Sequence, residues 1–260
     1  MTTDHRALLK KGSGAASAAA GAWLGTMVAG PGPGTAAGAA AGAAVAEVSK
    51  AVLDDIANRY LSPREQVRIA NTAAEAIEKI AARLLWDSRR DDGFFDVEPG
   101  WPCPAEEVFE GVLLAAKQEH EQLKLQYLSN FYANLVFDAS VKAPEANHLL
   151  TLAESLTYRQ LCLLSLVDQK TEYPVRDQLW PESGTIPAES LDVAQQSFYL
   201  YQRQLLLSFS KEYGRAGFVM DVARVLPTEA ILSGTGKRLV SLMELWQIDK
   251  AELSVLARIW

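Results

Sequence analysis

The sequence has few of the residues that usually perform catalysis or bind metals. Of its 260 residues only two are cysteine and three are histidine. Cys103 and Cys162 lie far apart and form no C-x-x-C pattern, so neither a zinc site nor a disulfide framework is expected. This cysteine usage suits a reducing cytoplasm.

Positive charge is also scarce. Lys and Arg number 25 against 32 Asp and Glu, which gives a net charge of −7. No run of basic residues is dense enough to follow a phosphate backbone, and a nucleic-acid partner is therefore not expected.

Complete catalytic motifs are lacking as well. His120-Glu121 begins like the H-E-x-x-H zinc helix, but Lys124 stands where the second histidine belongs. His120 instead falls on the apolar face of an expected helix, where a buried or boundary imidazole is predicted. Gly234-Thr235-Gly236-Lys237 lacks the earlier glycine of a phosphate loop, and Arg238 replaces the hydroxyl that would bind magnesium. We therefore expect no enzymatic activity, no cofactor and no metal.

Residues 12–46 carry no charge and consist almost entirely of Gly, Ala and Ser. Small residues recur every four positions in two rows, which are separated by Gly30-Pro31-Gly32-Pro33. A step of four returns to nearly the same face of a helix, so each row forms a stripe along which another helix can approach closely. The segment predicts a glycine-zipper-like helical hairpin. The residues expected to mediate assembly and membrane contact are Ser17, Gly21, Trp23, Gly25, Gly34, Gly38 and Gly42.

The length and hydropathy of these arms indicate only conditional insertion. The first arm, residues 12–30, would be about 27 Å long at 1.5 Å per residue, against a hydrocarbon core about 30 Å thick. The second arm is shorter before it reaches Glu47, and it is expected to continue as a more polar helix through Val48, Val52 and Leu53. Since large apolar residues are few, a single arm lies near the balance between water and lipid, and self-assembly would shift that balance.

Other interpretations of this segment stay open. The arms are also compatible with helices packed against the protein's own body, where Ala and Gly allow close approach. A flexible low-complexity leader is a further alternative, since Gly disfavours helix. Arg6, Lys10 and Lys11 precede the uncharged run, as in a signal peptide, although the run is long and poor in Leu and Ile.

The middle of the chain predicts an antiparallel pair of long helices. Ser62-Pro63-Arg64-Glu65 is a capping box followed by a helix to about Ser88. After a proline-containing loop, a second helix is expected over 105–137. The expected stripe of the first helix is Val67, Ala70, Ala74, Ile77, Ala81 and Leu84, and that of the second is Phe109, Val112, Ala116, His120, Leu123, Tyr127, Phe131 and Leu135.

The C-terminal part predicts short helices with little β-structure. Helices are expected over 145–155, over 157–167 after a Thr157 cap, through 191–209, from about Ser233 to Trp246, and from Asp249 to the end. Short strands are expected at 172–176 and 218–226. This order is typical of a winged-helix module, but the helix 158–167 has one cation, Arg159. We therefore interpret the module as an oligomerisation or protein-binding surface rather than a DNA-binding one.

The fold class expected is thus mostly α, with a basic tail at 1–11, the hairpin at 12–53, the long-helix pair at 54–140 and the winged-helix-like module at 141–260. This plan resembles that of the abortive-infection alpha group and other antiphage effectors that act at membranes, over about residues 50–260. The matching stretches are Leu61-Ser62-Pro63-Arg64-Glu65, Glu107-Val108-Phe109-Glu110-Gly111-Val112-Leu113 and Leu156-Thr157-Tyr158-Arg159-Gln160-Leu161. The resemblance implies a bacterial immune effector that injures the host envelope.

The sequence therefore predicts a membrane-associated, pore-forming helical effector. Its expected partners are membrane lipid, further copies of itself and a protein trigger. Its expected location is the cytoplasm, conditionally or peripherally at the inner membrane. The alternative is a soluble helical adaptor or regulator whose Gly/Ala hairpin packs internally.

Overall fold

The computed structural model describes residues 36–97, 99–179, 187–210 and 214–260. Within these ranges the chain is mostly helical with a small three-stranded sheet, as predicted. The chain divides into two compact units, Met1–Glu154 (unit one) and Ser155–Trp260 (unit two). The sequence placed a boundary at 140/141, whereas the two units divide fourteen residues later, between Glu154 and Ser155. Each unit has a core of its own.

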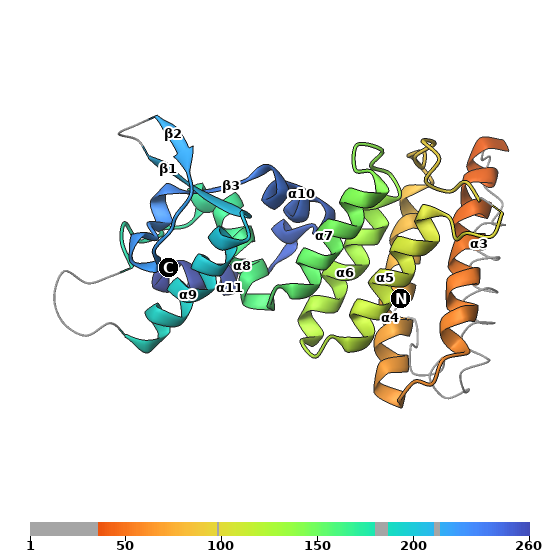
Figure 1. Cartoon of the computed structure of the whole chain (residues 1–260), viewed down its shortest axis with the longest axis horizontal. Helices are drawn as coiled ribbons and strands as arrows, with labels where there is room; N and C mark the ends of the chain where they lie inside the picture. Colours follow the sequence, from red (N-terminus) through yellow and green to blue (C-terminus); the bar gives the residue numbers. More distant parts are fainter. Residues whose placement is uncertain (1–35, 98, 180–186, 211–213) are drawn as a thin grey trace. The chain divides into compact units, whose positions relative to one another are not determined.

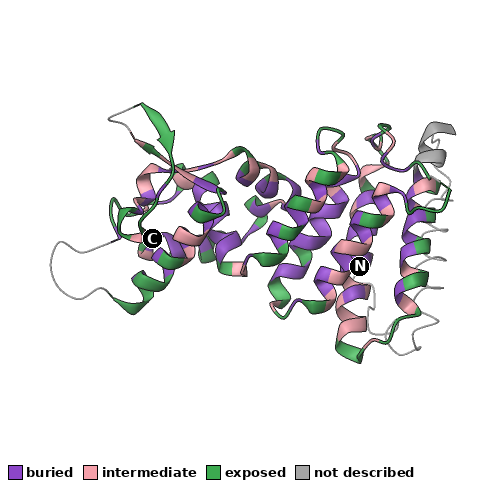
Figure 2. Cartoon of the chain, in the orientation of Figure 1, coloured by how far each residue is buried: buried purple, intermediate pink, exposed green. Residues whose placement is uncertain are grey.

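Unit one is a bundle of helices (Figure 1). Buried residues line the facing sides of its central helices, and exposed residues lie on the outer sides (Figure 2). The described elements of unit one are α3 (Ala36–Ala57), α4 (Pro63–Arg83), α5 (Pro104–Gln118), the 3-10 turn η1 (Gln122–Lys124), α6 (Leu125–Leu135) and α7 (Ala143–Ser155).

The start of α4 follows from its capping box, as predicted. The Glu65 N–H donates to Ser62 Oγ, and the Ser62 N–H donates back to Glu65 Oε2 at 2.7 Å. The helix ends at Arg83 rather than near Ser88. Its buried face is also rotated from the predicted stripe and shares only Ile77 with it, because the bulky Ile69 and Ile80 turn towards the core. The buried residues are Ile69, Thr72, Ala73, Ala76, Ile77 and Ile80.

The expectation of one helix over 105–137 was wrong. α5 ends at Gln118, and the chain turns through η1 into α6. Glu119 has extended backbone, and its carboxylate accepts the N–H groups of His120 and Glu121 at 2.8 and 2.9 Å. His120 therefore lies in the turn, where its side chain is 89% exposed instead of buried as expected.

A buried ion pair holds this turn in place. Lys124 Nζ lies 2.6 Å from Glu119 Oε2 and donates to the Glu154 carbonyl at 2.8 Å, and both charged side chains are almost fully buried. Burial acts to raise the pKa of Glu119, but the hydrogen bonds from Lys124 and the backbone N–H groups outweigh it. The pKa of Glu119 is consequently below its ordinary value.

The result is three packed helices in place of the expected pair. α6 runs in the same direction as α4, because Ser129 bonds Glu75 near the middle of both helices and Asn134 bonds Arg83 at their ends. α5 runs in the opposite direction and packs against both helices. Lys117 in the last turn of α5 lies 3.9 Å from Glu65 in the first turn of α4.

Unit two surrounds one central helix with short elements. The described elements are α8 (Tyr158–Asp168), η2 (Lys170–Glu172), α9 (Ala188–Gln202), β1 (Leu206–Ser210), β2 (Arg215–Gly217), η3 (Val222–Arg224), η4 (Pro227–Glu229), β3 (Ala230–Leu232), α10 (Gly234–Met243), η5 (Leu245–Gln247) and α11 (Lys250–Ile259). The sheet order is β2-β1-β3, with both pairs antiparallel, and Leu207 faces Ile231 across β1 and β3.

Several predicted boundaries in unit two were wrong. Residues 172–176 form no strand, since the chain there leaves η2 and reaches Pro174. The expected helix 191–209 stops at Gln202, because Gln204 adopts a positive φ of 56° that ends the helix and turns the chain into β1. The segment 218–226, expected as a strand, contains η3 instead. Asp221 caps the start of η3, because its side chain accepts the Ala223 N–H at 2.9 Å.

The helix expected at 157–167 is present as α8, and it is buried. Every residue of α8 from Gln160 to Val167 is buried, and α9, α10, α11 and β3 pack around it. Ser165 satisfies its buried hydroxyl by donating to the Leu245 carbonyl at 2.7 Å. The low charge of this helix therefore reflects its place at the centre of unit two, as is typical of a helix apolar on all sides.

Candidate functional site

α3 joins the small-residue segment to the body of unit one. Its first eleven residues, Ala36–Ala46, are uncharged, and polar residues appear only from Glu47 onwards. α3 packs against α5, and its buried valines and isoleucine, Val45, Val48, Val52 and Ile56, are between 1% and 6% exposed. The whole helix of 22 residues is about 33 Å long at 1.5 Å per residue.

The structure places only two of the predicted assembly residues. Gly38 and Gly42 both lie in α3, and Gly42 is buried. The others, Ser17, Gly21, Trp23, Gly25 and Gly34, lie outside the described residues.

Gly42 belongs to a continuous buried face of α3. It precedes Val45, Ser49, Val52 and Ile56 at alternating steps of three and four residues, which is the spacing of one helical face. The Ser49 hydroxyl on this face is buried without a hydrogen-bond partner. The end of the second small-residue row therefore lies on the same face of α3 as the buried Val52 and Ile56.

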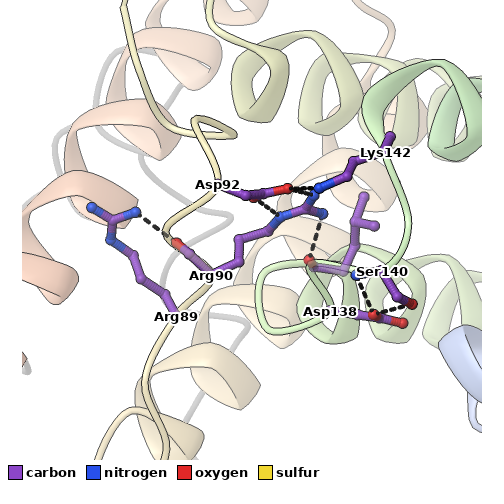
Figure 3. Close-up of polar contacts among 7 residues, drawn as sticks. Arg89, Arg90, Asp92, Asp138, Ser140 and Lys142 are labelled. Atoms are coloured by element: carbon purple, nitrogen blue, oxygen red, sulfur yellow. Dashed lines mark hydrogen bonds and ion pairs between the residues drawn. The ribbon is translucent and has the colours of Figure 1, made fainter.

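The connection from α4 to α5, residues 84–103, is fixed by a buried arginine (Figure 3). Arg90 Nε and Nη2 donate to the two oxygens of Asp92, each at 2.7 Å, and Lys142 Nζ lies 2.7 Å from Asp92 Oδ2. The Arg90 guanidinium also stacks 4.2 Å from the Phe94 ring, and the backbone N–H of Arg90 donates to the Val136 carbonyl. The hydrogen bonds from Arg90 lower the pKa of Asp92 far below its ordinary range.

The same connection presents large apolar side chains to solvent. Leu85 is 86% exposed, Trp86 and Trp101 are each 74% exposed, and Val97 is 70% exposed. None of these four residues was predicted as a site from the sequence. Their position in a loop rich in Asp and Pro could have indicated them, because tryptophan in such a loop is not explained by the buried face of a helix.

The described residues offer little reactive chemistry. They contain no group of three or more His, Cys, Asp or Glu side chains placed to hold a metal ion. Burial raises the pKa of the Cys103 thiol and raises that of Cys162 to about 12, so neither is a thiolate at neutral pH. Among the described helices, none combines the length and hydropathy required to cross a membrane.

The functional assignment thus depends on α3 with its adjoining segment and on the 84–103 connection. Comparison of the chain with family models, with curated proteins and with solved structures found no match.

Proposed function

We propose that this protein is a membrane-associated helical effector that assembles through its N-terminal small-residue segment and permeabilises a bilayer. The observation that carries the proposal is the continuity of α3. One helix contains both the uncharged residues Ala36–Ala46 and the buried residues that attach it to α5. Because α3 is one continuous helix, a movement at one of its ends is passed to the other end. The helices of unit one can in this way restrain or release the N-terminal segment that is proposed to assemble.

The resemblance to the abortive-infection alpha group supports a role in bacterial defence against phage. In this proposal the protein rests in the cytoplasm or peripherally at the inner membrane, and a protein trigger shifts it towards assembly. The weak hydropathy of residues 12–46 supports an insertion that depends on several copies packing together.

A dye-release assay on vesicles containing anionic lipid tests the proposal. The full chain is expected to release the dye at concentrations at which it self-associates. Gly38→Leu places a bulky side chain on the small-residue row and should abolish release. Ala43→Leu is the matched control, because it adds the same side chain at an exposed position of the same helix off that row. No leakage from the self-associated wild type would refute the proposal.

A second function, a soluble helical adaptor with an internally packed segment, is favoured by the burial of Gly42 on the face of α3 that also carries Val52 and Ile56. Fractionation of a lysate separates the two. An effector is expected in the membrane pellet, at least after triggering, whereas an adaptor stays in the supernatant.

A further inference from the structure

The exposed apolar residues of the 84–103 connection are concentrated at one end of unit one. Leu85 and Trp86 directly follow α4, which ends at Arg83, and Val97 and Trp101 shortly precede α5, which begins at Pro104. Since α5 starts where the connection ends, all four belong to the end of the bundle where α4 stops. We name Leu85, Trp86, Val97 and Trp101 the apolar rim.

The apolar rim is held on a fixed support. Phe94 and Phe95 from the middle of the connection are buried, and the Phe94 carbonyl accepts the Ala105 N–H at 2.9 Å. Arg90 fastens the connection to the end of α6 through the Val136 carbonyl. The buried Phe94 and Phe95 thus anchor the loop. The other two aromatic residues of the loop, Trp86 and Trp101, stay exposed to solvent.

The uncharged half of α3 points to the same end of unit one. Arg59, just beyond the C-terminal end of α3, binds Glu110 of α5, and Glu65 pairs with Lys117 in the last turn of α5. The C-terminal end of α3 therefore lies towards the end of α5, and its N-terminal half runs back towards the start of α5, as Figure 1 shows. α3 therefore begins, at Ala36, at the end of unit one that carries the apolar rim (Figure 1).

We infer that the apolar rim is a membrane-contact surface that docks unit one on the headgroup region of a lipid bilayer. Tryptophan is enriched at this depth, because its ring is apolar and its indole N–H stays hydrated. The inference depends on the proposed function and adds to it the surface of the body that meets the lipid. Bilayer contact at this end would place the N-terminal segment against the membrane it is proposed to enter.

The charges of the connection indicate which lipid property matters. The acidic residues Asp87, Asp91, Asp96 and Glu98 outnumber the partly buried cation Arg89, so anionic headgroups do not attract this loop. The apolar rim therefore contributes to vesicle binding through the hydrophobic effect. Its contribution to the binding free energy should be the same on zwitterionic and on mixed anionic vesicles, and it should not depend on salt.

Co-sedimentation of the full chain with phosphatidylcholine vesicles, with and without phosphatidylglycerol, tests the inference. Trp86→Ala combined with Trp101→Ala should lower the partition coefficient by about tenfold or more on both vesicle types. The control is Met220→Ala combined with Trp246→Ala, which removes two exposed apolar side chains from unit two, 85% and 46% exposed. Replacing both tryptophans of the rim with Phe should retain most of the binding. Because both are three-quarters exposed, the fold is expected to survive, and circular dichroism checks this.

The outcomes separate this inference from the proposed function. Equal binding of the wild type and the rim variant would overturn the inference and leave the proposed function standing. No binding of the wild type to either vesicle would overturn both. A rim variant that lowers self-association without vesicles would instead identify the rim as an interface between copies, which also overturns the inference.

Discussion

The close approach of α10 to the chain before β1 gives a sharp steric prediction. A Cβ atom on Gly236 would lie 2.3 Å from the Leu205 carbonyl oxygen and 3.3 Å from its carbon. That carbonyl cannot move freely, because it accepts the Ser233 N–H at 3.0 Å. Gly234, two residues earlier in the same helix, has no atom within 4 Å of such a Cβ. The pair therefore differs in steric surroundings while the substitution is the same.

The magnitude follows from two opposing terms. Alanine is favoured over glycine within a helix by up to about 1 kcal/mol, a gain that Gly234→Ala should partly realise. In Gly236→Ala the added methyl meets a backbone atom that no rotamer change can avoid, and overpacking of this kind costs about 1–3 kcal/mol or more. We expect Gly236→Ala to be less stable than Gly234→Ala by about 2–3 kcal/mol. Urea unfolding of both variants, followed by tryptophan fluorescence, measures this difference. Equal stability would refute the close approach.

The ion pairs of Arg90 and Lys124 and the attachment of α3 give further predictions. Asp92→Asn should lower the free energy of unfolding by about 2 kcal/mol, while the exposed Asp91→Asn should change it by less than about 0.5 kcal/mol. Folding lowers the pKa of Asp92 below its ordinary 3.8, so the carboxylate stabilises the folded state above that pH. The difference in the free energy of unfolding between wild type and Asp92→Asn should therefore shrink as the pH falls below 3.8. Glu119→Gln should cost about 3 kcal/mol by leaving the Lys124 ammonium buried beside a neutral group, and adding Lys124→Met should restore part of the loss in the same urea titration. Val52→Asp should cost about 3 kcal/mol by burying a carboxylate against α5, measurable as earlier proteolysis of α3.

Local chemistry explains which parts of the fold the sequence predicts well. The helix starts at Ser62, Thr157, Ser233 and Asp249 are all confirmed, since each cap is formed by a side chain and an N–H two or three residues away. Such caps depend on neighbours in the sequence and need no tertiary partner.

The turn at Glu119 shows where local reasoning stops. No Pro or Gly marks it, and apolar residues continue at helical spacing through it. What stabilises the turn is distant in sequence, because Arg68 donates to the Glu119 carbonyl and Lys124 reaches the Glu154 carbonyl. For the candidate site, the continuation of the second arm as a helix through Val48 and Val52 is confirmed. The helix that it packs against, α5, could not be predicted, because the spacing of apolar residues shows a buried face but not what covers it.

The burial of Gly42 makes self-assembly and attachment to the body compete for one face of α3. If copies pack along the row of Gly34, Gly38 and Gly42, they need the face of α3 that also carries the buried Val52 and Ile56. Val52→Asp weakens the attachment without touching the row. Under competition it should therefore increase vesicle leakage above that of the wild type, despite its lower stability. Leakage that falls together with stability would instead show that the packed α3 is the active form, and that the small residues serve the body rather than its copies.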